Sequence, residues 1–134
     1  MEQTRHIPIE NEHDIVLCRR SSRELARELG FNLVDQTRIT TTASELARNI
    51  YEYAKKGEVV IEAIENGDGT IGLKMTFIDN GPGIENIETA LGEGWTSHRG
   101  MGLGLPGSKK LMDDFNIEST VGKGTKVTVI KWQK

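Results

Sequence analysis

Residues 57–83 read GEVVIEAIENGDGTIGLKMTFIDNGPG, and this stretch determines which fold the chain can adopt. Two runs typical of β-strands, residues 58–65 and 71–78, flank the sequence NGDG at residues 66–69. Asparagine and glycine tolerate the positive φ that tight hairpin turns need. We therefore expect an antiparallel hairpin followed at once by a glycine-rich loop. One face of the second run should be buried, because its apolar residues alternate: Ile71, Leu73, Met75 and Phe77.

Two helices are expected before this hairpin. The first should begin with Asp14 as its cap and end at Gly30. Its buried positions recur at three- and four-residue steps: Ile15, Cys18, Ser22, Leu25 and Leu29. The second should cover residues 35–56, with Gly57 as its stop. Its buried positions are Ile39, Ala43, Leu46, Ile50 and Ala54. This spacing places Cys18 in the core, since a reactive thiol would need an exposed, electropositive setting.

The remaining segments complete an α+β pattern. Glycines punctuate residues 79–104, after which the pattern predicts a helix over 106–115 and strands at 117–120 and 126–132. Residues 4–9 are expected to form an edge strand that Pro8 interrupts. This order predicts a two-layer sandwich, with helices on one face of a mixed, mainly antiparallel sheet. Residues 1–134 are expected to form one domain, because they contain no repeat, linker or low-complexity tract.

Length, charge and cysteine content exclude several classes of protein. A chain of 134 residues can bury a sufficient core without a disulfide or structural metal. Its single cysteine cannot form an internal disulfide, which fits a reducing cytoplasm. A formal charge of −3 provides no electrostatic footprint for nucleic acid. No apolar run approaches the roughly 20 residues of a membrane span. We therefore expect a cytoplasmic protein that binds neither nucleic acid nor membrane.

Glu45 and Asn49 form the first candidate site. They stand four residues apart on the second expected helix, so they lie about 40° apart around its axis, beside the apolar stripe. Asparagine is a poor helix former, but its amide oxygen is a suitable ligand for a hard cation such as Mg²⁺. The alternative is a solvated helix face on which this asparagine has no function.

A second candidate site, DNGPG at residues 79–83, directly follows the second hairpin strand. Gly81 and Gly83 put no β-carbon in the way of an approaching ligand. The carboxylate of Asp79, held at a strand end, can accept a hydrogen bond from the exocyclic amine of a flat heterocycle. The alternative is a plain turn, because these residue types are the commonest in turns.

The third candidate site is GMGLGLPG at residues 100–107, which leads into the expected helix with Pro106 near its first turn. A glycine loop of this kind presents free N–H groups and the positive end of the helix dipole, which suits phosphate. Gly102, Gly104 and Gly107 also match the dinucleotide fingerprint G-x-G-x-x-G. However, no clear strand precedes them, and too few residues follow Gly107 to complete a Rossmann sheet.

Residues 84–99 separate the two glycine clusters and show little apolar periodicity. Such a segment is usually a lid or a disordered loop. His98 within it is expected to be solvated, with contact to a nucleotide or partner as the alternative. The chain has no cysteine partner and no spaced histidine pair, so we expect no transition-metal site.

Taken in this order, the clusters resemble a known set of motifs. The set comprises E-x-x-x-N at Glu45, D-x-G-x-G at Asp79, G-x-G-x-G at Gly100, and Gly124-Thr125. These motifs resemble the N, G1, G2 and G3 boxes of the gyrase/Hsp90/histidine-kinase/MutL ATPase superfamily. The text ELARNIYEYA, DNGPGI, GMGLGLPGSKKLMDDF and GKGTKVTVIKW is similar to the short anti-sigma regulatory serine kinases, above all the RsbT-type switch kinases. The resemblance covers roughly residues 15–134 and departs in the lid, where His98-Arg99 replaces small residues.

The resemblance implies a site for ATP and Mg²⁺. Asn49 would hold Mg²⁺ against the phosphates, and Glu45 would be the general base. Asp79 would accept the adenine amine, with Thr125 supporting that contact through its hydroxyl. Arg99 is expected to contact the terminal phosphate. The glycines whose backbone would approach or wrap the nucleotide are Gly81, Gly83, Gly100, Gly102 and Gly104.

The resemblance also implies a function, a serine/threonine-protein kinase of a bacterial partner-switching stress-response module. Its acceptor would be a serine or threonine of a STAS-domain antagonist or scaffold protein, and a PP2C-type phosphatase or a sigma factor would be released or activated. The alternative is a nucleotide-gated module that sequesters a sigma factor or regulator with little kinase activity. A detached histidine-kinase catalytic domain fits less well, since no helix with an acceptor histidine fits before Asp14. The sequence leaves open the substrate's identity, the signal, the preference for ATP over ADP, and whether the chain forms a homodimer.

Overall fold

A single antiparallel sheet organises the structure, a computed structural model that describes residues 4–84 and 104–133. The described strands pair in the order β1-β2-β3-β5-β4, and every neighbouring pair is antiparallel. The elements are β1 (Thr4–Ile9), α1 (Glu12–Glu28), α2 (Leu33–Asn49), a π-helical turn (Ile50–Ala54), β2 (Gly57–Glu65), β3 (Ile71–Asp79), α4 (Gly104–Leu111), β4 (Asp114–Thr120) and β5 (Gly124–Trp132).

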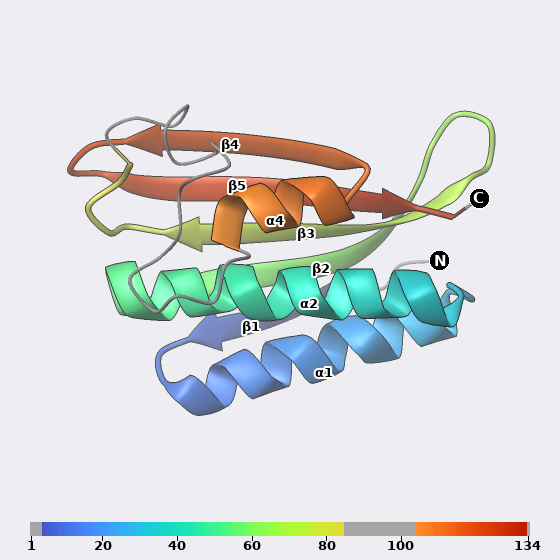
Figure 1. Ribbon diagram of the computed structural model, residues 1–134, viewed down its shortest axis with the longest axis horizontal. Helices are drawn as coiled ribbons and strands as arrows, with labels where there is room; N and C mark the ends of the chain where they lie inside the picture. The colour runs from blue at the N-terminus through green and yellow to red at the C-terminus, as the bar shows by residue number, and fades with distance from the viewer. Residues whose placement is uncertain (1–3, 85–103, 134) are drawn as a thin grey trace.

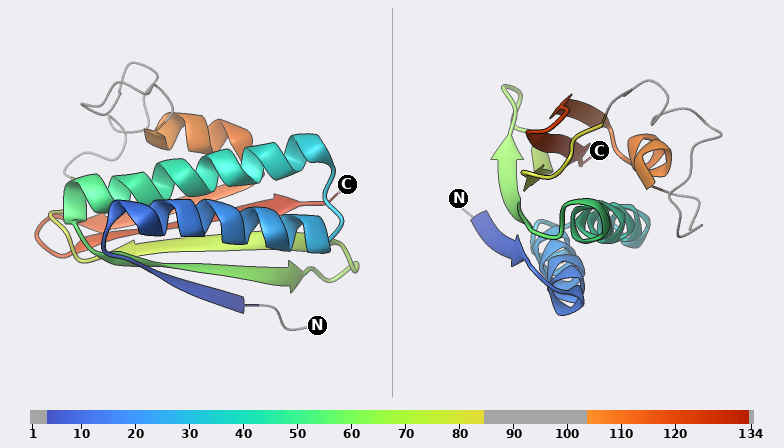
Figure 2. Two further views of the ribbon diagram at one scale, coloured as in Figure 1. Left: turned by 90° about the horizontal axis from the view of Figure 1, so that it is seen from below. Right: turned by 90° about the vertical axis from the view of Figure 1, so that its left-hand side faces the viewer.

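Helices α1, α2 and α4 cover one face of this sheet, with α2 between the other two (Figures 1 and 2). The core lies between the two layers and draws its fully buried side chains from both, including Ile39, Leu46, Val59, Met75 and Val129. Burial of alternate strand residues and of one stripe of each helix produces this arrangement. The predicted α+β two-layer sandwich is therefore confirmed.

The predicted hairpin forms β2 and β3, in a register that places Ile61 opposite Met75. In the connecting turn, the Asn66 side chain accepts hydrogen bonds from the backbone N–H groups of Asp68 and Thr70. Gly69 has a φ of +89°, in the region that glycine adopts without a steric penalty. The turn chemistry of the sequence thus determines the register of the two central strands.

Helix α1 begins one turn earlier than predicted, because its N-cap is Asn11 and not Asp14. The Asn11 side chain accepts from the backbone N–H of Asp14, and the Asp14 carboxylate accepts from that of Asn11, a reciprocal capping box. The predicted end is confirmed, since Gly30 has a φ of +88° and Phe31 donates to the Ala26 carbonyl. Cys18 is fully buried, as predicted.

The second helix also differs from its prediction at its end. Regular α-helix stops at Asn49, and residues Ile50–Ala54 form a π-helical turn closed by a bond from the Lys55 N–H to the Ile50 carbonyl. Lys55, with a φ of 72°, reverses the chain, so Gly57 is not the helix stop. Gly57 belongs to β2, where a β-carbon would lie 2.6 Å from Cγ2 of Ile50. It is required for close packing of strand and helix.

Two further predictions are corrected at the edges of the sheet. The helix expected to reach residue 115 ends at Leu111, and Phe115 belongs to β4, where it lies opposite Val129. The chain turns at Asp113, whose backbone N–H donates to the Ile130 carbonyl. Strand β1 continues through Pro8, because its position on an edge strand leaves no ladder bond for the missing N–H to make.

Candidate functional site

The first two predicted motifs meet at one end of the molecule. Helix α2 ends there with Asn49, β3 ends there with Asp79, and the N-terminal end of α4 points the same way (left in Figure 1). Residues separated by about thirty positions in the chain are therefore neighbours in the fold. The arrangement follows from the antiparallel path, which returns β3 alongside the helix that precedes the hairpin.

Close packing joins the end of α2 to the loop after β3. A β-carbon on Gly81 would lie 2.5 Å from Cβ of Ala54, in the π-helical turn. No residue other than glycine fits at position 81 without displacing this turn. π-Helical turns are frequent at functional sites, where they change the direction of a helix. Here the turn directly follows Asn49 and places the helix end against the DNGPG loop.

Asp79 is half-buried at the last position of β3. Its Oδ1 accepts a hydrogen bond of 2.8 Å from the Gly81 N–H, which fixes the orientation of the carboxylate. Within the described residues, Oδ2 has no hydrogen-bond partner. Asp79 can therefore accept a further hydrogen bond from a ligand, which is the chemistry that the sequence suggested.

Glycines also bring the β4–β5 turn against this loop. Gly124 has a φ of +125°, and a β-carbon there would overlap the Asp79 carbonyl oxygen. Gly83 has a φ of +80°, and its β-carbon would overlap the carbonyl oxygen of Thr120. The Gly122 N–H donates to the Pro82 carbonyl at 2.8 Å. The loop after β3 is thus held between the α2 end and this turn.

Thr125 lies directly opposite Asp79 in the β3–β5 register. Its hydroxyl is hydrogen-bonded at 2.8 Å to the hydroxyl of Ser119 on β4. Ser119 Oγ also lies 3.1 Å from the Gly124 carbonyl oxygen and accepts from the Ile84 N–H at 2.7 Å. Sequence reasoning missed Ser119, although it occupies the inward-facing row of β4 after Phe115 and Ile117. It connects the loop after β3 to the β4–β5 turn.

Glu45 and Asn49 are both half-buried near the end of α2. Across residues 4–84 and 104–133, neither side chain makes a hydrogen bond or ion pair. A half-buried carboxylate and amide left unpaired on one side of a helix are available to a ligand or substrate. Neither residue is needed to hold the fold together through polar contacts.

A hollow in the surface adjoins part of the predicted site. A shallow pocket of about 200 Å³ is lined by Asp79 and Thr125 together with Ser119, Lys123 and neighbouring residues. Gly104 is the first residue of α4. The lid was predicted over residues 84–99, of which all but Ile84 lie outside the described residues, as do the site residues Arg99, Gly100 and Gly102. A hollow of about 470 Å³ lies at the opposite end of the sheet, lined by Gly30, Asp35, Thr70 and others. No residue of the three motifs lines it.

The sequence of this region matches a known protein family. The family model of the histidine kinase-, DNA gyrase B-, and HSP90-like ATPases matches residues 34–134, which include every predicted motif. The chain belongs to this ATPase family. The resemblance that the sequence motifs indicated is therefore confirmed, and use of ATP is a property that this family implies.

Individual relatives narrow the position of the chain within the ATPase family. It is 49% identical over 126 residues to the serine/threonine-protein kinase RsbT of Bacillus subtilis, covering 94% of each chain. It is 34% identical over 113 residues to an anti-sigma F factor of Clostridium acetobutylicum, covering 79% of this chain and 76% of that one. The expected function, a partner-switching serine/threonine kinase, agrees with these relatives.

Solved structures agree on the fold. The RsbU and RsbW domains of Rv1364c from Mycobacterium tuberculosis superpose with a TM-score of 0.66 at 21% identity, covering 98% of this chain and 33% of that one. A chain of the SiaB-SiaC complex from Pseudomonas aeruginosa superposes with a TM-score of 0.54 at 12% identity, covering 98% and 89%. The two-layer arrangement is thus the fold of this ATPase family.

Among the described residues, metal-binding clusters and membrane-spanning helices are both absent. In residues 4–84 and 104–133, no three His, Cys, Asp or Glu side chains gather where they could hold a metal ion. Of the helices described, none is long and apolar enough to cross a membrane.

Proposed function

We propose that this chain is an ATP-dependent serine/threonine-protein kinase that phosphorylates a STAS-domain antagonist protein in a bacterial partner-switching module. It acts in the cytoplasm as one ATPase domain. A PP2C-type phosphatase or a sigma factor is the downstream partner. The observation that carries the proposal is the packing of Ala54, in the turn that follows Asn49, against Gly81 of the Asp79 loop, in a chain 49% identical to a serine/threonine-protein kinase.

The residues at this end of the molecule fit an adenine nucleotide. Asp79 Oδ1 is engaged by Gly81, which leaves Oδ2 to accept the adenine amine. Asn49 would hold Mg²⁺ through its amide oxygen, together with phosphate oxygens, because amide and phosphate oxygens are the hard ligands that Mg²⁺ prefers. Arg99, Gly100, Gly102 and the N-terminal end of α4 at Gly104 would bind the phosphates.

The remaining predicted residues would shape the adenine side of the site. Gly81 and Gly83 leave the backbone of the loop free of β-carbons. Thr125 would support the Asp79 contact from the facing strand, in the position that its bond to Ser119 gives it. The hydrogen bond between Thr125 and Ser119 supports a rigid surface beside the adenine ring.

Glu45 is the group that would accept a proton. Mg²⁺·ATP, when bound, supplies the γ-phosphoryl group and offsets the charge that develops during transfer. The Glu45 carboxylate would take the hydroxyl proton of the acceptor serine. The serine oxygen would then bond to the γ-phosphorus while ADP leaves. Its half-buried position, without a competing partner among the described residues, supports this role.

The proposal is tested by incubating the chain with [γ-³²P]ATP and a purified STAS-domain antagonist. We expect the wild type to label the antagonist. Glu45→Ala should lower the transfer rate by about 10²–10⁴-fold, the usual contribution of a general base, while retaining ATP binding. Glu65→Ala, an exposed position at the far end of the hairpin, is the matched control. Transfer by Glu45→Ala at the wild-type rate would contradict the assigned role.

A second function is favoured by the anti-sigma F factors among the relatives. In this alternative the chain sequesters a sigma factor or regulator when nucleotide is bound, with little transfer of phosphate. The same experiment separates the two functions. If the chain binds a partner protein only when ATP is present, and that partner carries no ³²P label afterwards, the sequestering module is favoured.

A further inference from the structure

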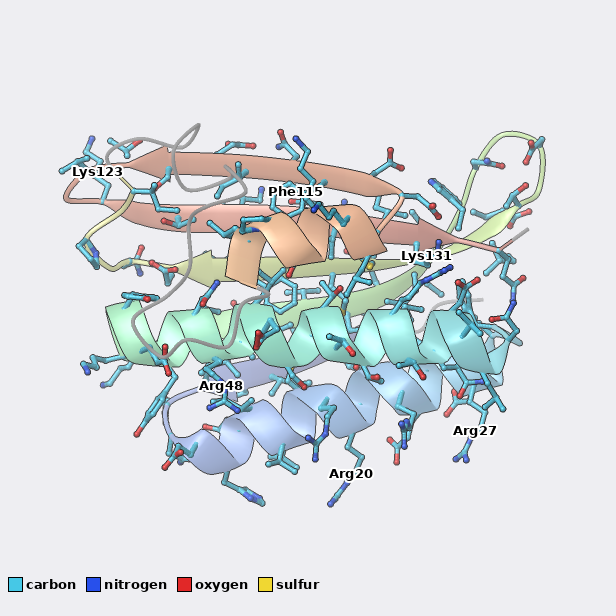
Figure 3. All side chains as sticks on the ribbon, viewed as in Figure 1. Arg20, Arg27, Arg48, Phe115, Lys123 and Lys131 are labelled. Atoms are coloured by element: carbon cyan, nitrogen blue, oxygen red, sulfur yellow. The ribbon has the colours of Figure 1, made fainter. Side chains whose placement is uncertain are left out.

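Three polar side chains form a row across one end of the sheet. Ser119 of β4 lies directly opposite Thr125 of β5, and Thr125 lies directly opposite Asp79 of β3. Opposite side chains point to the same face of a sheet, here the helix-covered face, since Val127 on β5 belongs to the core. Lys123, in the turn between β4 and β5, marks this end of the sheet in Figure 3. The three residues of the row also line the shallow pocket beside the Asp79 loop.

The Ser119 hydroxyl has three polar neighbours. Its oxygen accepts a hydrogen bond of 2.7 Å from the Ile84 N–H. The Gly124 carbonyl oxygen lies 3.1 Å away and can only accept. The Thr125 hydroxyl lies 2.8 Å away and can either donate or accept. Because a serine hydroxyl has one proton, Ser119 can donate to Gly124 or to Thr125, but not to both.

One assignment of the protons turns all three contacts into hydrogen bonds. In it, Ser119 donates to the Gly124 carbonyl, and Thr125 donates to Ser119. In the reverse assignment Ser119 donates to Thr125, and its contact with the Gly124 carbonyl is no longer a hydrogen bond. Gly124 is buried, so water has little access to replace the bond that is lost. The first assignment is therefore the more stable one.

This assignment determines what Thr125 offers to a ligand. Its proton is held by Ser119, so its oxygen presents lone pairs and no donor toward the pocket. Asp79, the next residue in the row, likewise offers an acceptor, because Oδ1 is engaged by the Gly81 N–H and Oδ2 is not. Two neighbouring acceptors match an amine, which carries two N–H donors. They do not match a carbonyl, which carries none.

We propose that Ser119 is a positioning residue that holds the Thr125 hydroxyl as an acceptor, and so makes the site selective for a base with an exocyclic amine. That the ligand is an adenine nucleotide rests on the proposed function. The direction of the Thr125 hydroxyl rests on the three contacts of Ser119.

Ser119 contributes to selectivity in a way that Asp79 alone cannot. A threonine hydroxyl that turned freely would donate to one ligand and accept from another. The bond to Ser119 removes this freedom. The bond between Ser119 and the Ile84 N–H has a different effect, because it holds the loop after β3 and so bears equally on every nucleotide. The ratio of two nucleotide affinities separates the two effects.

The test compares the Kd of ATP with that of purine riboside triphosphate, the analogue that has hydrogen in place of the amine. Both are measured by calorimetry with Mg²⁺ and without an acceptor protein. The wild type should prefer ATP. Ser119→Ala should lower this preference by about three- to tenfold, up to the contribution of one hydrogen bond. Ser119→Thr keeps the hydroxyl and should keep the preference. Thr128→Val is the control, because Thr128 lies on β5 but on the opposite face of the sheet.

A double variant shows whether Ser119 acts through Thr125. Thr125→Val removes the hydroxyl at nearly constant volume and should lower the preference for ATP at least as far as Ser119→Ala does. Adding Ser119→Ala to Thr125→Val should then produce no further fall, because the group that Ser119 orients is already absent. A purely structural role of Ser119 would instead leave the preference of each variant at the wild-type value.

The outcomes separate this inference from the proposed function. ATP binding with an unchanged preference in Ser119→Ala would overturn the role of Ser119 and leave the proposed function intact. An equal fall in Thr128→Val, or a further fall in the double variant, would also overturn it. If the wild type bound neither nucleotide, the proposed function would fail and this inference with it. Should Ser119→Ala not fold, Ser119→Cys replaces it, since a thiol is only a weak donor and acceptor.

Discussion

Ala54 and Gly81 pack so closely that a β-carbon added to Gly81 would lie 2.5 Å from Cβ and 2.9 Å from Cα of Ala54. Ala54 ends the π-helical turn that follows Asn49, and Gly81 belongs to the loop that follows Asp79. This contact holds the two predicted halves of the nucleotide site together. The geometry of the site therefore depends on the absence of one methyl group.

Gly81→Ala should disturb the site through this contact. We expect a loss of about 1–3 kcal/mol in the free energy of unfolding, as for other overpacked positions, and weaker binding of Mg²⁺·ATP. Adding Ala54→Gly to Gly81→Ala removes the nearer contact, at 2.5 Å, but leaves Cα of residue 54 at 2.9 Å, so it should restore binding in part. Urea denaturation and calorimetric titration measure the two effects.

Gly67→Ala is the matched control, because nothing lies within 4 Å of a β-carbon at this position in the β2–β3 turn. It should leave nucleotide binding unchanged. If Gly81→Ala bound ATP as the wild type does, or if Ala54→Gly restored none of the lost binding, the contact between the β-carbons would not position the site.

Lys131 should contribute strongly to stability through a buried ion-pair cluster. Its side chain is 8% exposed, and Nζ lies 3.1 Å from Oδ1 of Asp113 and 3.8 Å from Oδ1 of Asp35. Lys131→Met would remove the buried cation that both carboxylates share, although Asp35 would keep its pair with Arg38, so we expect a loss of about 2–3 kcal/mol in the free energy of unfolding. Urea denaturation measures it.

Arg38→Met is the comparison, because Arg38 also pairs with Oδ1 of Asp35 but its side chain is 46% exposed. Exposed pairs of this kind contribute less than about 1 kcal/mol. Equal losses in the two variants would show that burial does not set the strength of the Lys131 cluster.

Cys18 should make stability depend on pH in alkaline solution. Burial raises the pKa of its thiol from 9.0 to about 12. The unfolded chain therefore loses this proton near pH 9, whereas the folded chain keeps it until about pH 12. The folded state binds more protons in this window, so its stability falls as pH rises, by about 1.4 kcal/mol per pH unit for one group.

The free energy of unfolding of the wild type minus that of Cys18→Ala isolates this slope from other titrating groups. The difference should be constant below pH 9 and should decrease above it. Iodoacetamide should modify Cys18 at neutral pH only after unfolding. Rapid modification of the folded chain would contradict the assignment of this thiol to the core.

Local patterns predicted most of the fold because they act over a few residues. The alternation in β3 and the NGDG turn determine the central hairpin, and Gly30 ends α1 where expected. The errors arose where two local signals competed. Asn11 is the cap in place of Asp14, because reciprocal hydrogen bonds between the two residues satisfy the backbone N–H groups of both. Phe115 joins β4 because its alternation with Ile117 matches the strand period, although it also continued the helical pattern.

Residue types in the sequence suggest the chemistry of the candidate site, whereas its contacts have no local signal. The roles of Glu45, Asn49 and Asp79 stay predictions, and the structure adds that the antiparallel path brings their elements to one end of the molecule. The π-helical turn could not be predicted, because it depends on packing of Ala54 against Gly81, which are far apart in the chain. The bonds of Ser119 to the Thr125 hydroxyl and the Ile84 N–H are likewise tertiary contacts with no local signal.

Thermal unfolding in the presence of Mg²⁺ and nucleotide tests the central claim most directly, that an adenine nucleotide binds between the end of α2 and the Asp79 loop. ATP at one hundred times its Kd stabilises a protein by about 2.7 kcal/mol, so the wild-type Tm should rise by several degrees. Asp79→Ala and Asn49→Ala should abolish the rise. GTP should not produce it, since guanine presents a carbonyl where adenine presents its amine to Asp79. An unmoved wild-type Tm, or an equal rise in all three proteins, would contradict the account.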